Sequence, residues 1–156
     1  TGVRYARGCA LESTHYTGPE ENILLGAQMV ELLKRRGFGT KHFIIDTAKS
    51  GQPTEWSDMI AANKGEERDN ARTCTRPGMT RCVTLGIPPT ARPADPEWGL
   101  SSQTRQLAAE HVDGFVWFGR PWLYYPADPF VMERALDMVR STPWPELNDE
   151  GPNPLS

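Results

Sequence analysis

Hydrophobic residues along this chain form two kinds of pattern, short compact runs and longer stretches with helical spacing. Three compact apolar runs, at about 3–11, 41–46 and 112–118, are bounded by polar residues or glycine. Such runs are typical of strands buried on both faces of a parallel sheet. The pattern therefore predicts three strands.

The stretch between the first two runs predicts a helix over about 19–36. Pro19 suits the first helical position, and the two glutamates after it complement the positive end of the helix dipole. Gly37 follows three basic residues and is a natural helix terminator. Two further helices are predicted at about 101–111 and 129–140. The apolar residues that recur at helical spacing in the first helix are Leu25, Met29, Leu32 and Leu33.

The order of these elements is strand, helix, strand, long loop, helix, strand, helix, which predicts an α/β fold with parallel strands. At 156 residues the chain falls in the single-domain range. A Pro- and Gly-rich loop at about 50–100 interrupts the alternation, and its dispersed apolar residues favour an ordered, packed loop. The polar, Pro-rich end predicts a disordered tail over 146–156, so the folded domain is expected at 1–145.

Charge and composition exclude several classes of function. The net charge is −3 and the basic residues are scattered, so we expect neither nucleic acid nor a membrane as partner. No apolar run approaches the ~20 residues that span a bilayer. No second His or Cys follows His15 at metal-ligand spacing, so we expect no metal and no cofactor. The chain begins at Thr1 without a leader motif, so we expect a mature protein or a piece of a longer one.

The chain has three cysteines. Cys74 and Cys82 lie eight positions apart in the long loop and can close a small disulfide ring, which leaves Cys9 as a free thiol. This arrangement favours an oxidising compartment. Three reduced cysteines packed as small core residues are the alternative.

Candidate chemistry follows the end of each predicted strand. Ligands of parallel α/β folds bind beyond the carboxyl ends of the strands, so we expect these clusters to line one rim. They combine carboxylates, basic groups and aromatic rings, which suits sugar binding because aromatic faces stack on the apolar faces of pyranose rings. The candidate binding residues are Glu12, His15, Tyr16, Asp46, Lys49, Trp117, Arg120 and Trp122.

Two of these residues also have a purely structural explanation. Asp46 can brace the loop that follows it. Trp117 lies inside a predicted strand and suits a core position. The aromatic cluster formed by Trp122, Tyr124 and Tyr125 beside Pro and Arg is the stronger indication of a binding surface.

Four stretches of the chain carry recognisable motifs. In chain order they are RGCALESTHY at 7–16, HFIIDTAKSG at 42–51, CVTLGIPPT at 82–90 and VDGFVWFGRP at 112–121. Together they resemble glycoside hydrolase family 6, the cellobiohydrolases and endoglucanases of bacteria and fungi. The resemblance covers about 3–126. FIIDTAKSG and VDGFVW are fairly specific when they occur together in this order.

The resemblance implies a distorted β/α barrel, secretion, and hydrolysis of β-1,4-glucan with inversion. Inversion uses two carboxyl groups about 6.5–9.5 Å apart, one of which protonates the leaving oxygen. In the family this general acid lies well before the RG…Y segment, a position that would fall before Thr1. A whole barrel takes roughly 200–250 residues. We therefore expect the C-terminal part of an endoglucanase-like enzyme, inactive alone, with the N-terminal half of the barrel as partner and a β-glucan as substrate.

Several residues depart from the family. It has Asn where this chain has Glu12, Arg at Lys49 and Trp at Arg81. Loss of that Trp removes a sugar-stacking platform, and Lys lacks the planar fork by which Arg holds carboxylates. The family's Asp-Gly, whose Asp is the proposed catalytic base, is also missing. Asp128 is the nearest carboxylate and our catalytic candidate, although it is not aligned and can instead cap the last helix.

These departures keep two other hypotheses open. One is a non-catalytic carbohydrate-binding relative that has lost the acid–base pair. The other is an independent α/β module of unrelated function.

Overall fold

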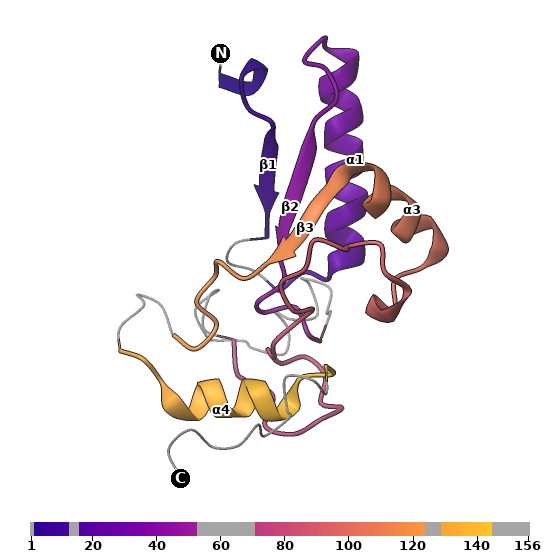
Figure 1. The fold of residues 1–156 in the computed structure, drawn as a ribbon. Coiled ribbons are helices and arrows are strands. Elements are labelled where there is room, and N and C mark those ends of the chain that lie inside the picture. Colours follow the sequence, from indigo (N-terminus) through magenta and orange to yellow (C-terminus); the bar gives the residue numbers. More distant parts are fainter. Residues whose placement is uncertain (1, 13–15, 53–70, 124–128, 145–156) are drawn as a thin grey trace.

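The computed structural model describes residues 2–12, 16–52, 71–123 and 129–144, and Figure 1 shows their arrangement. The helices and strands follow the sequence pattern to within a few residues, except at the beginning of the first strand. The elements in chain order are a 3₁₀ turn at Gly2–Arg4, β1 at Gly8–Leu11, α1 at Pro19–Arg35, β2 at His42–Asp46, a 3₁₀ turn at Pro96–Trp98, α3 at Ser102–His111, β3 at Val112–Val116 and α4 at Met132–Ser141.

The three strands form one parallel sheet in the order β1-β2-β3, which confirms the predicted α/β class. Gly8 pairs with His42, and a Cβ at Gly8 would collide with the His42 carbonyl, so the sequence needs glycine here. The first strand is shorter than predicted. Its expected beginning is the 3₁₀ turn Gly2–Arg4, a separate element that precedes the sheet.

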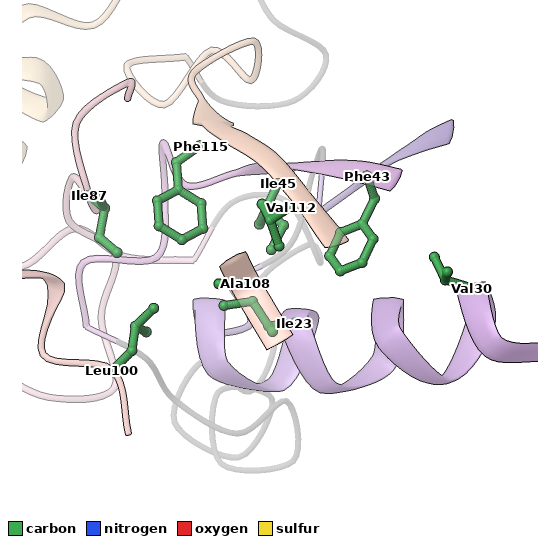
Figure 2. Packing of buried hydrophobic residues seen from close by; sticks show 9 residues of the cluster. All are labelled: Ile23, Val30, Phe43, Ile45, Ile87, Leu100, Ala108, Val112 and Phe115. Carbon is green, nitrogen blue, oxygen red and sulfur yellow. The ribbon is translucent and has the colours of Figure 1, made fainter. Parts of the chain in front are cut away.

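The main core lies between the sheet and the helices α1 and α3, which pack against each other on one face (Figure 1). Figure 2 shows how α1 supplies Ile23 and Val30 to this layer while α3 supplies Ala108. Gly26 lies against the ring of Phe43, where a Cβ would overlap the ring atoms. The buried cluster is Ile23, Val30, Phe43, Ile45, Ile87, Leu100, Ala108, Val112 and Phe115.

The helical spacing of leucines in α1 does not mark its buried face. Leu25 and Leu32 are 57% and 49% exposed. The buried positions of α1 are Pro19, Asn22, Ile23, Gly26 and Val30. The sheet therefore contacts α1 on the side that bears Gly26, where the absence of a Cβ lets the helix approach Phe43 closely.

A second, smaller cluster joins α4 to the loops beyond the carboxyl ends of the strands. In Figure 1, α4 lies past the arrowheads of the sheet. Arg134 of α4 is buried and donates to the carbonyl oxygens of Pro121 and Ala71 and to Thr73 Oγ1, at 2.6, 3.0 and 2.9 Å. The cluster consists of Tyr16, Ala71, Val83, Leu85 and Met138.

The described part of the long loop is attached to the rest at several points. Cys74 and Cys82 form a disulfide with an S–S distance of 2.05 Å, and Cys9 has a free thiol whose pKa is raised by burial. Thr90 exchanges two backbone hydrogen bonds of 3.0 Å with Phe115 of β3. Thr84 Oγ1 donates to the carbonyl oxygen of Met138 in α4 at 2.8 Å. The disulfide thus closes a ring within the loop, and the hydrogen bonds fix the loop against both the sheet and α4. No helix among the described residues is long and apolar enough to cross a membrane.

Candidate functional site

Asp46 ends β2, and its carboxylate connects two neighbouring segments. The residue is 4% exposed. Its Oδ1 accepts a hydrogen bond of 2.9 Å from the backbone N–H of Ala48, and its Oδ2 accepts one of 2.6 Å from the N–H of Gly119. The side chain therefore ties the segment after β2 to the segment after β3.

Burial raises the pKa of Asp46 above its ordinary value because an ionised carboxylate loses its water shell there. The N–H groups of Ala48, Gly119 and Phe118 and the charge of Lys49 act in the opposite direction. Both carboxylate oxygens accept from the backbone. Asp46 therefore positions the two segments. The structural explanation from the sequence covered only its bond to the loop that follows it, not the bond to Gly119.

Lys49 and Tyr16 connect the segments after β1 and β2. Lys49 Nζ lies 6.0 Å from the centre of the Tyr16 ring, within the range of a cation–π contact. The ring itself is buried, and the Tyr16 hydroxyl accepts a hydrogen bond of 3.2 Å from the N–H of Ala71. The buried Tyr16 ring thus packs beneath the ammonium group of Lys49, and Lys49 itself is half-buried.

The two tryptophans after β3 occupy different environments. Trp117 is half-buried, packs against the smaller cluster and donates from Nε1 to the carbonyl oxygen of Ile87 at 2.9 Å. Trp122 is 36% exposed, and its ring lies 6.4 Å from that of Phe130 at an angle of 46°. Arg120 between them is exposed. Trp122 and Arg120 therefore present side chains to solvent, whereas Trp117 is used for packing.

Glu12 follows β1 in a left-handed conformation, with φ at 57°. Asn22 Nδ2 lies 3.5 Å from Glu12 Oε2 and also donates to the carbonyl oxygens of Thr17 and Gly18. Glu12 thus lies beside the first turns of α1. The sequence candidates His15 and Asp128 lie outside the described residues.

We call the group formed by Glu12, Tyr16, Asp46, Lys49, Trp117, Arg120 and Trp122 the rim. Tyr16 and Asp46 are its buried members, and the other five are at least partly exposed. The hydrogen bonds and the cation–π contact above link its three segments at one edge of the sheet. Among the residues of the described ranges, no group of three or more His, Cys, Asp or Glu side chains is arranged to hold a metal ion.

Two groups that shape the rim were not identified from the sequence. The first is the backbone N–H of Gly119, which no sequence pattern marks as the partner of Asp46. The second is Arg134, which holds the carbonyl of Pro121 at 2.6 Å. Arg134 lies four residues before Met138, so the two side chains share the buried face of α4. This spacing was the signal in the sequence that Arg134 is buried.

The fold and the rim together define the class: an α/β protein with a parallel sheet whose carboxyl edge bears a buried carboxylate, a lysine on a tyrosine ring and an exposed tryptophan.

No family model and no curated protein sequence matches the chain. Among solved structures, a GH6 enzyme of Orpinomyces sp. Y102 is similar with a TM-score of 0.48 and 22% sequence identity, over 88% of this chain and 34% of that one. The chain thus spans about a third of that enzyme's length. A likeness of this size supports no argument about activity.

Proposed function

We propose that this chain is part of a secreted β-1,4-glucan hydrolase of the family 6 type and supplies one wall of its substrate cleft. The support comes from the residues of the resemblance. HFIIDTAKSG and VDGFVWFGRP are 60 or more residues apart in the chain, at 42–51 and 112–121, yet Asp46 of the first accepts a hydrogen bond from Gly119 of the second. This contact brings the two motifs together beyond the carboxyl ends of β2 and β3.

In this proposal Trp122, Arg120 and Lys49 contact the sugar. The exposed face of Trp122 stacks on a pyranose ring, and the two cations donate to its hydroxyl groups. Tyr16 and Trp117 are positioning residues, because the first is buried under Lys49 and the second bonds to Ile87.

The acid and the base of an inverting reaction are proposed to be residues other than the sugar-contacting ones. Asp46 is unsuited to either role because both of its oxygens accept backbone hydrogen bonds. The general acid is assigned to a partner segment outside this chain, the N-terminal half of the barrel, and Asp128 remains the proposed base. The chain alone is therefore expected to bind β-glucan without cleaving it.

A non-catalytic carbohydrate-binding protein is the second candidate. Arg81 favours it: this residue stands where the family has a stacking Trp, and it adopts a left-handed conformation with φ at 58°. A protein with a rim but without this platform can keep sugar affinity after losing turnover.

Titration of the chain with cellotetraose, followed by calorimetry and by release of reducing sugar, tests the proposal. We expect saturable binding that is stronger than for maltotetraose, no hydrolysis, and a tenfold or greater loss of affinity in Trp122→Ala. The matched control is Tyr5→Ala, which removes an aromatic ring that is 88% exposed beside the amino end of the sheet. Failure to bind either saccharide, or equal losses in the two variants, would contradict the rim assignment.

Two further outcomes separate the hypotheses. Hydrolysis of cellotetraose by this chain would contradict the placement of the acid outside it. For the protein produced from the full gene, hydrolysis with inversion supports the first candidate, and binding without hydrolysis supports the second.

A further inference from the structure

A cavity of about 330 Å³ lies on the helix-covered side of the sheet, near the carboxyl ends of the strands. The start of α1, the segment after β2 and the stretch 98–100 form its walls together with Trp144. Its inner lining includes Ile87 and Leu100, which belong to the main core. No residue of the rim lines it, so it is a separate site.

Two tryptophans form one corner of this cavity. The rings of Trp98 and Trp144 meet edge to face, with centres 5.5 Å apart and an angle of 77°. Trp98 Nε1 donates to the carbonyl oxygen of Arg92 at 2.7 Å, which fixes the orientation of its ring. Both residues are half-buried. The corner therefore offers an apolar surface on which the Trp98 ring is held in place before any ligand binds.

The polar side chains of the cavity lining are acidic or neutral. Glu20 and Glu21 of the first turn of α1 line the cavity, and Glu20 is oriented by accepting from the N–H of Ser101 at 2.5 Å. Ser50 adds a hydroxyl group. Among the described residues that line the cavity, none is a Lys, Arg or His. This lining disfavours anions and favours a ligand that donates hydrogen bonds to carboxylates.

The indole N–H of Trp144 is a further donor at this corner. Its Nε1 is buried and has no hydrogen-bond partner among the described residues. Buried indole N–H groups normally have a partner. A ligand hydroxyl near the cavity wall would supply one after a small movement of the ring.

We propose that this cavity binds a single pyranose unit. One apolar face of the sugar would stack on the Trp98 side of the corner, while its hydroxyl groups donate to Glu20 and Glu21. The volume lies at the lower end of ligand pockets, which fits one sugar ring rather than a chain. The inference goes beyond the proposed function, because it uses no residue of the rim and stands if the rim binds nothing.

Titration with methyl β-glucoside tests this site, with the indole N–H signals of the tryptophans followed by nuclear magnetic resonance. We expect saturable shifts of the Trp98 and Trp144 signals. Sorbitol is the control ligand, because it has the hydroxyl groups of a hexose but no rigid apolar face. It should leave both signals in place.

Two variants make the test specific. Trp98→Ala should abolish saturation at this site, and Glu21→Gln, an exposed change that leaves the tryptophan corner intact, should weaken binding about threefold or more. Trp122→Ala on the rim is the matched control and should leave the Trp98 shifts unchanged. Equal loss in Trp122→Ala and Trp98→Ala would assign the effect to the rim. Absence of saturable shifts in the unmodified chain, or saturation by tetramethylammonium instead of the glucoside, would overturn the proposal.

Discussion

The Oδ2 atom of Asp46 accepts a hydrogen bond of 2.6 Å from the backbone N–H of Gly119, 73 residues further along the chain. With its other oxygen bonded to Ala48, this carboxylate fixes the relation between the segments that follow β2 and β3. The rim depends on that relation, since Lys49 belongs to the first segment and Trp122 to the second.

Replacing Asp46 by Ala is expected to lower the free energy of unfolding by about 1–3 kcal/mol. Two backbone N–H groups, those of Ala48 and Gly119, would lose their acceptors inside the protein. Urea denaturation measures the change. The control is Asp137→Asn on α4, which is expected to stay within about 0.5 kcal/mol.

The contribution of Asp46 to stability is also expected to depend on pH, which gives a second, independent measurement. Folding raises the pKa of this carboxyl, so the folded state holds the proton more tightly than the unfolded one. The contribution of Asp46 to stability is therefore largest below about pH 3.9 and declines as pH rises through the raised pKa. Asp46→Asn should remove this decline in urea midpoints measured across the acidic range. An unchanged pH profile would contradict the assignment.

Asp113 is expected to show the opposite pH dependence. Arg7 Nε lies 2.9 Å from Asp113 Oδ2, and His42 Nδ1 lies 2.9 Å from Oδ1, so the residue joins the beginnings of all three strands. The hydrogen bond and charge of Arg7 hold the pKa of Asp113 below its ordinary value. Its contribution is thus present above about pH 3.9 and is lost as pH falls through the lowered pKa.

The measurement is the difference in urea midpoint between the unmodified chain and Asp113→Asn. We expect a small difference near pH 7, because the three side chains are partly exposed, and its disappearance at the acidic end. High salt should reduce it as well. A difference that grows toward low pH would show that the ion pair does not stabilise the sheet.

Gly26→Ala is expected to destabilise the protein although alanine favours helices by about 1 kcal/mol over glycine. The new Cβ would overlap the ring of Phe43, and overpacking of this kind typically costs about 1–3 kcal/mol. Gln28→Ala on the exposed face of α1 is the matched control and should be neutral or slightly stabilising. Thermal unfolding of the two variants measures the contrast, and a higher midpoint for Gly26→Ala would refute the close packing.

Arg134→Met should lower the free energy of unfolding by about 1–3 kcal/mol, because it leaves buried acceptors without their donor. The affected groups are the carbonyls of Pro121 and Ala71 and the hydroxyl of Thr73. Arg140→Met on the exposed side of α4 is the control. Because Pro121 precedes Trp122, we also expect cellotetraose binding to weaken in Arg134→Met. Retained stability and affinity would show that α4 does not support the rim.

Local patterns were sufficient for the order and type of the elements. The compact run around Phe43 and Ile45 is a central strand, and Pro19 is the first residue of α1. Turn and cap residues act over a few positions, so their effect is visible in the sequence. For this reason the α/β class and the parallel order could be predicted.

The orientation of α1 could not be predicted in the same way. Apolar residues occur on more than one side of this helix, and the leucines at 25 and 32 form the more obvious stripe. The sheet instead contacts the side that bears Gly26, because the ring of Phe43 needs the space that a missing Cβ leaves. Which face of a helix is buried depends on its partner, and the partner comes from another part of the chain.

The sequence by itself thus determined the secondary structure, the α/β class and the set of polar and aromatic residues that follow the strands. Only the tertiary structure decided what those residues do. In the folded chain, Asp46 connects two segments by hydrogen bonds and Trp117 packs against the smaller cluster, whereas Trp122 is exposed. The rings of Trp98 and Trp144, 46 residues apart in the sequence, meet only in the folded chain. The physical reason is that burial and hydrogen-bond partners depend on contacts between distant segments, whereas helix and strand preferences depend on neighbouring residues.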